Sequence, residues 1–190
     1  MWEYLIHSNN KDKLASQIIK SGYLDIYDTT HSHPDSEPGI FMNLLFNTLE
    51  YEGKYWHYRA YTHKSPYVIF GFDTNILNEY PFKICSNQGH ALCKGDEILM
   101  EGNKKQSLSG VKKHINQSLK HSVYKTNDPF YFTETHEVMI RKRLPLEKCK
   151  FIMIQKSNKL KEKIKEKYPH IKLIYITLKT ENYKELLETI

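Results

Sequence analysis

The segment from Phe151 to Leu178 constrains the fold more than any other part of the sequence. An apolar run over 150–154 predicts a strand. The helix that follows carries its apolar residues on one face: Leu160, Ile164 and Tyr168. Ser157 is the expected N-cap of this helix, Pro169 ends it, and residues 171–178 form a second predicted strand. The domain therefore contains both strands and helices.

Apolar and β-branched runs elsewhere predict further strands. They are Leu5–Ile6, Gly39–Met42, Tyr67–Phe72 and Glu137–Ile140. A helix is expected over about 11–20, capped by Asn9 or Asn10 and ended by Gly22. The segment Ser86–Asn127 is polar. Because strands and helices do not alternate regularly, we expect an α+β domain.

Length and composition indicate an ordinary folded protein. The chain has 190 residues, of which 39% are hydrophobic and 13% aromatic. These side chains are sufficient for a core, and the length fits a single domain over residues 1–190. The formal charge of +6 is compatible with a polyanionic partner such as a nucleic acid or a dinucleotide.

The sequence also predicts where the protein works. No apolar run reaches the roughly 18 residues of a membrane-spanning helix, and the first residues lack the pattern of a signal peptide. The three cysteines, Cys85, Cys93 and Cys149, do not form a disulfide framework. We expect a soluble, intracellular protein with no membrane partner. Frequent Lys, Asn, Ile and Tyr are typical of AT-rich genomes such as those of large DNA viruses, and a viral protein would act in the cytoplasm or nucleus of its host.

Three stretches carry side chains suited to ligand chemistry. His7 and Ser8 end a strand, where they can bind a hydroxyl or amide group, although an exposed histidine in a turn is an equally good interpretation. Glu137 opens a strand and could accept a proton, or it could be a charge that protects an edge strand from aggregation. The stretch Tyr55–Phe70 mixes aromatic and basic residues, which stack bases and hold phosphates. A protein-facing aromatic cluster is the alternative for this stretch.

A metal site is not expected. His31 and His33 stand in a loop, and Cys85, His90 and Cys93 form a loose group without the paired spacing of a zinc site. A nucleophile elbow, a phosphate loop and a glycine-rich dinucleotide motif are absent from the sequence.

Taken in order, these pieces resemble the ADP-ribosyltransferase fold, and within it the DarT-like enzymes that modify bases in DNA. The stretches that carry the resemblance are Leu5–Leu24, Tyr58–Pro66, Glu137–Glu147 and Phe151–Leu178. The resemblance implies a split mixed or antiparallel β-sheet core with flanking helices. It also implies a mono-ADP-ribosyltransferase that uses NAD as its substrate and modifies a nucleic acid or protein acceptor.

The resemblance implies roles for the matching residues. The expected NAD-binding residues are His7, Ser8, Arg59, Tyr61, Lys64 and Tyr67, and the expected catalytic residues are Glu137 and His7. His7 would hydrogen-bond the nicotinamide ribose, and the backbone beside it would hold the carboxamide. A tyrosine would stack on the nicotinamide ring, and a basic residue would neutralise the pyrophosphate. Glu137 would bind a ribose hydroxyl and stabilise the positive charge that develops as nicotinamide leaves. DNA or RNA would approach from the side of the polar segment 86–127.

Two other functions fit the same residues. One is a non-catalytic module on the same fold that binds a nucleic acid or a host factor. The other is a metal-independent phosphodiesterase or nuclease that uses a pair of histidines as acid and base. The candidates for such a pair are His7, His57, His63 and His136.

Overall fold

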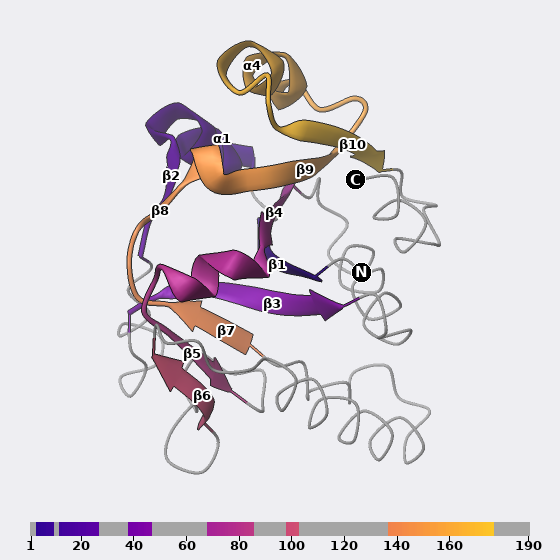
Figure 1. Ribbon diagram of the computed structural model, residues 1–190. Helices are drawn as coiled ribbons and strands as arrows, with labels where there is room; N and C mark the ends of the chain where they lie inside the picture. The colour runs from indigo at the N-terminus through magenta and orange to yellow at the C-terminus, as the bar shows by residue number, and fades with distance from the viewer. Residues whose placement is uncertain are drawn as a thin grey trace, which may run out of the picture. The chain divides into compact units, whose positions relative to one another are not determined.

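The computed structural model describes residues 3–9, 12–26, 38–46, 68–85, 98–102 and 137–176 (Figure 1). The chain divides into two compact units. The first unit comprises Met1–Leu24, Leu45–Thr74 and Leu144–Ile190, and the second comprises Asp25–Leu44 and Asn75–Arg143. The single domain over residues 1–190 stays a prediction.

The described part of the first unit is built on four neighbouring strands (Figure 1). They are β1 (Glu3–Asn9), β4 (Val68–Asp73), β9 (Cys149–Gln155) and β10 (Lys172–Ile176). Their order is β10-β9-β4-β1, and the pairs are antiparallel except for β9 with β10. One row of paired residues crosses all four strands: Asn9, Val68, Ile154 and Tyr175. We call the end of the sheet that this row marks the Asn9 end.

Helix α4 (Leu160–Lys167) makes the crossover that the parallel pair of β9 and β10 requires. Leu160 and Ile164 are buried, as their helical spacing predicts. The expected cap, Ser157, is wrong: Ser157 is exposed, whereas the Oδ1 atom of buried Asn158 accepts a hydrogen bond of 2.9 Å from the backbone N–H of Leu160. Asn158 can be buried because both polar ends of its side-chain amide are hydrogen-bonded, Oδ1 to the N–H of Leu160 and Nδ2 to Oδ1 of Asp12.

Helix α1 (Asp12–Ser21) buries Ala15 and Ile19, and the predicted helix in this region is confirmed. Gly22 ends it with a φ of 82°, a left-handed conformation that suits glycine, and its N–H donates to the carbonyl of Ile18 at 2.9 Å. Asn9 is the last residue of β1 and Asn10 lies outside the described residues, so the expected cap of this helix stays a prediction.

The C-terminal end of α4 is tied to the C-terminal end of α1. The Tyr168 hydroxyl donates to the carbonyl of Ile19 at 3.2 Å. The Lys167 ammonium donates to the carbonyls of Ile19 and Lys20 at 3.1 and 2.7 Å. The last turn of a helix leaves such carbonyls without partners inside the helix, so these two side chains complete α1.

A short ladder that the sequence analysis missed also belongs to the first unit. Strands β2 (Tyr23–Leu24) and β8 (Leu144–Pro145) pair in antiparallel fashion. The N–H of Leu146 extends this ladder by donating to the carbonyl of Gly22 at 2.8 Å. Each strand has only two residues, which is too short for a hydrophobic pattern to be visible in the sequence.

The described part of the second unit is an antiparallel sheet in the order β3-β7-β5-β6. Its strands are β3 (Ile40–Phe46), β7 (Glu137–Ile140), β5 (Phe82–Cys85) and β6 (Ile98–Gly102). The first two were predicted, whereas β6 lies inside the stretch that the sequence analysis read only as polar. A short 3-10 helix, η1 (Thr74–Asn78), leads from β4 toward β5.

A glycine in β4 makes room for the largest side chain of β9. Gly71 pairs with Phe151, and a Cβ atom at Gly71 would collide with the Phe151 ring. That ring is fully buried and meets the ring of Tyr4 edge-on, with 5.0 Å between the centroids. The close approach of Phe151 to the β4 backbone therefore fixes which residue can occupy position 71.

The described elements form an α+β fold with mixed and antiparallel strand pairing and flanking helices, as expected from the sequence. Among the described residues, no helix is long and apolar enough to span a membrane.

Replacing Gly71 with Ala should lower the free energy of unfolding by about 1–3 kcal/mol, because the new methyl group overpacks against the Phe151 ring. Urea denaturation followed by circular dichroism measures this loss. Adding Phe151→Leu should make the double variant more stable than the sum of the two single losses allows. A Gly71→Ala variant with an unchanged urea midpoint would contradict this packing.

Candidate functional site

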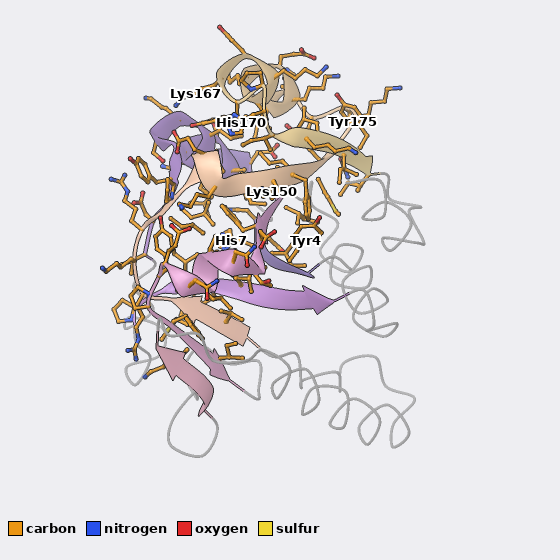
Figure 2. The ribbon with its side chains drawn as sticks, in the orientation of Figure 1. Tyr4, His7, Lys150, Lys167, His170 and Tyr175 are labelled. Atoms are coloured by element: carbon orange, nitrogen blue, oxygen red, sulfur yellow. The ribbon has the colours of Figure 1, made fainter. Side chains whose placement is uncertain are left out.

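His7 lies two residues before the end of β1 in the first unit (Figure 2). It pairs with Phe70, and the two rings are tilted by 36° with 6.5 Å between their centroids. His7 is half-buried, Ser8 is exposed and Asn9 is buried. Because His7 and Ser8 are consecutive residues of β1, the half-buried imidazole and the exposed hydroxyl lie on opposite faces of the strand, and each can hydrogen-bond a ligand only on its own face.

Strand β4, which follows the aromatic and basic residues up to Tyr67, begins next to the end of β1. Val68, the first residue of β4, pairs with Asn9. The expected ligand-binding residues of that stretch lie outside the described residues: Arg59, Tyr61, Lys64 and Tyr67. Because β4 begins at Val68, the chain enters the sheet at the Asn9 end directly after Tyr67. Their roles stay predictions.

The turn between β9 and α4 is fixed at the same end of the sheet. The Nδ2 group of Asn158 donates to Oδ1 of Asp12, the first residue of α1, at 3.2 Å. The N–H of Asn158 donates to the carbonyl of Gln155 at 2.9 Å. Asn158 therefore joins the start of α4 to the start of α1, close in sequence to Ser8.

Glu137 belongs to the second unit and is the first residue of β7. Its backbone pairs with Asn43 of β3 on one side and with Cys85 of β5 on the other. The interpretation of Glu137 as a charge on an edge strand is therefore wrong, because β7 has a neighbour on both sides. The remaining residues of β7 are buried: Val138, Met139 and Ile140. The Glu137 side chain itself lies outside the described residues, so its catalytic role stays a prediction.

A buried lysine lies near this position, and the sequence analysis missed it. Lys83 of β5 is only 6% exposed and pairs with Met139. It stands two residues before Cys85, the partner of Glu137. A lysine between apolar neighbours in a strand suggests a side chain that faces water, so the pattern Phe82-Lys83-Ile84 gave no signal for burial.

Two groups of the first unit are held neutral by their surroundings. Burial raises the pKa of the Cys149 thiol, which donates to the carbonyls of Gly71 and Phe151 at 3.3 and 3.0 Å. Cys149 is thus a poor nucleophile, because only the thiolate reacts readily. Burial also raises the pKa of the Tyr4 phenol, and the nearby charge of Asp73 raises it further.

Within the described ranges, no three His, Cys, Asp or Glu side chains gather in a way that could hold a metal ion. His31, His33, His90 and Cys93 lie outside those ranges, as do His57, His63 and His136 of the proposed acid–base pair. The absence of a metal and the pairing of histidines both stay predictions.

Comparison with solved structures shows proteins that share the fold of this chain. DarT of Thermus sp. 2.9 in complex with ADP-ribosylated ssDNA matches with a TM-score of 0.57 and 12% identity, over 91% of this chain and 93% of that chain. The same protein in complex with NAD+ matches with a TM-score of 0.56 and 12% identity, over 91% and 94% of the two chains.

A third structure is similar over a shorter part of its own length. Thermosipho africanus DarTG in complex with ADP-ribose has a TM-score of 0.50 and 14% identity, over 92% of this chain and 50% of that chain. No protein-family model and no curated protein sequence matches the chain. The chain therefore shares the fold of the DarT structures, and the predicted structural resemblance is confirmed.

Replacing Asn158 with Ala should lower the free energy of unfolding by about 1–3 kcal/mol, because Asp12 and the N–H of Leu160 both lose a buried hydrogen-bond partner. The neighbouring Ser157→Ala is the matched control, since an exposed side chain should change stability by less than about 0.5 kcal/mol. Urea denaturation distinguishes the two. Equal effects of the two substitutions would show that Asn158 does not hold the turn.

Proposed function

We propose that the chain is an NAD-dependent mono-ADP-ribosyltransferase that modifies a nucleic acid. The observation that carries the proposal is the shared fold, which extends over nearly the whole of this chain and of DarT structures in complex with NAD+ and with ADP-ribosylated ssDNA. A soluble enzyme that acts inside a cell, on DNA or RNA, follows from the same proposal.

His7 is the proposed anchor for the nicotinamide ribose, with Ser8 as a further NAD-binding residue. Packing against Phe70 restricts the imidazole of His7, so less side-chain freedom is lost when it binds a hydroxyl group. The backbone beside His7 would hold the carboxamide, next to the exposed Ser8. Tyr61 or Tyr67 would stack on the nicotinamide ring, and Arg59 or Lys64 would neutralise the pyrophosphate.

Glu137 is the proposed catalytic carboxylate. In the transfer, the bond between ribose C1′ and the nicotinamide nitrogen breaks, and nicotinamide leaves with the bonding electrons. The acceptor atom then forms a bond to C1′ and releases a proton. Glu137 would stabilise the positive charge on the ribose before the new bond forms and would accept that proton. Its backbone pairs with a strand on each side, which fixes the main chain at this position and suits the role.

Millimolar NAD should raise the melting temperature of the purified protein, because a ligand that binds only the folded state stabilises it. At about 100 times the dissociation constant the gain is about 2.7 kcal/mol. His7→Ala should reduce the shift. His170→Ala, which removes an exposed histidine of the first unit, should leave it unchanged. Absence of any shift in the unsubstituted protein would contradict the proposal.

Glu137→Gln should abolish nicotinamide release from NAD in the presence of single-stranded DNA or RNA. Its own melting temperature should change little, because one oxygen is replaced by a group of the same size. Nicotinamide is measured by chromatography, and the modified oligonucleotide by mass spectrometry. Glu147→Gln, at an exposed carboxylate, is the matched control and should retain turnover. Retained turnover in Glu137→Gln would remove Glu137 from the mechanism.

A further inference from the structure

The positive charge of the chain is concentrated in one short part of the first unit. Between Lys156 and Lys172 there are seven lysines and two glutamates, a net charge of +5 within a chain whose total is +6. All of these lysines except Lys161 are exposed. Fixed charge of this density attracts polyanions and increases their rate of association.

Not all of these lysines are available to a partner. Lys161 donates to the carbonyl of Lys156 at 2.8 Å, and Lys167 completes the end of α1. On the outward side of α4, Glu162 and Glu166 are exposed one turn apart and offset the neighbouring lysines. The uncompensated charge is therefore concentrated before the helix, at Lys156 and Lys159.

Lys156 and Lys159 lie in the turn between β9 and α4, at the Asn9 end of the sheet. Both are exposed on either side of buried Asn158, whose hydrogen bonds fix the turn. The backbone that carries the two lysines is thus ordered before any ligand binds, which reduces the entropy lost on binding.

An exposed aromatic ring lies beside this turn. Tyr175 of β10 is 38% exposed, and it pairs with Ile154, two residues before Lys156 (Figure 2). It belongs to the same row of paired residues as Asn9. Neighbouring strands are about 4.8 Å apart, so this row extends about 14 Å from β1 to β10.

We propose that Lys156, Lys159 and Tyr175 form a binding surface for single-stranded nucleic acid at the Asn9 end of the first unit. Lysines that hold backbone phosphates and a ring on which a base stacks are the usual means of binding a single strand. The surface would hold the acceptor strand at the same end of the sheet as His7, so the inference rests on the proposed function and specifies where its substrate lies.

The pyrophosphate of NAD fits these residues less well than a nucleic acid does. A pyrophosphate is compact and would occupy only the two lysines, whereas a strand of nucleotides also brings bases to the exposed ring of Tyr175. An acidic protein could form ion pairs with the two lysines, but its carboxylates would not stack on the exposed ring of Tyr175. The combination of charge and ring therefore favours a strand of nucleotides.

The test is fluorescence anisotropy of a labelled single-stranded oligonucleotide, titrated at several salt concentrations without NAD. Lys156→Gln with Lys159→Gln should weaken binding and reduce the slope of log K against log salt by about 1.4, since each phosphate contact contributes about 0.7. Tyr175→Ala should weaken binding by roughly tenfold, and Tyr175→Phe, which keeps the ring, should retain it.

A matched double variant removes the same charge at the other end of the first unit. Lys20→Gln with Lys150→Gln changes two exposed lysines, one in the last turn of α1 and one at the start of β9 (Figure 2). This control should bind the oligonucleotide like the unsubstituted protein. Equal losses of oligonucleotide affinity in both double variants, or unchanged affinity in Lys156→Gln with Lys159→Gln, would contradict the proposed binding surface.

Thermal shifts with NAD separate this inference from the proposed function. All variants of the surface should keep the NAD-induced rise in melting temperature. Loss of that rise in Lys156→Gln with Lys159→Gln would assign the lysines to the dinucleotide and overturn the inference. Nucleic-acid binding that depends on the three residues in a protein that NAD does not stabilise would uphold the surface and reject the transferase.

Discussion

Strand β9 is the element on which the first unit depends. Four consecutive residues, Phe151 to Ile154, are buried, so β9 is covered on both faces while it pairs with β4 and β10. The Phe151 ring fits only because Gly71 opposite it has no side chain. This fit fixes the register of β4 on β9, and β4 in turn fixes β1. The position of His7 and Ser8 at the Asn9 end follows from that register.

The sequence could predict the elements whose signal is local. Helices α1 and α4 have apolar residues at helical spacing, and β4, β7 and β9 are runs of β-branched and aromatic residues. Their order was sufficient to predict the fold class and its resemblance to the DarT structures. The place of His7 and Ser8 at a strand end was also predictable, because the apolar run before them stops there.

Features that depend on distant partners could not be predicted in this way. Whether β7 is an edge or an inner strand is decided by Asn43 and Cys85, far from Glu137 in the sequence. The burial of Lys83 likewise results from its neighbours in the sheet. Ser157 and Asn158 are both good capping residues, and only the contact with Asp12 selects Asn158.

The pairing of the first unit also determines how the chain can assemble during synthesis. Strand β4 needs β1 on one side and β9 on the other, and β9 is made only after the whole of the second unit. At about 5–20 residues per second, the apolar run of β4 therefore waits for several seconds without its second neighbour. The strands of the second unit, all made before β9, are complete earlier. Synthesis thus favours closure of the second unit first, and the end of β1 acquires its final surroundings only when β9 and β10 have been added.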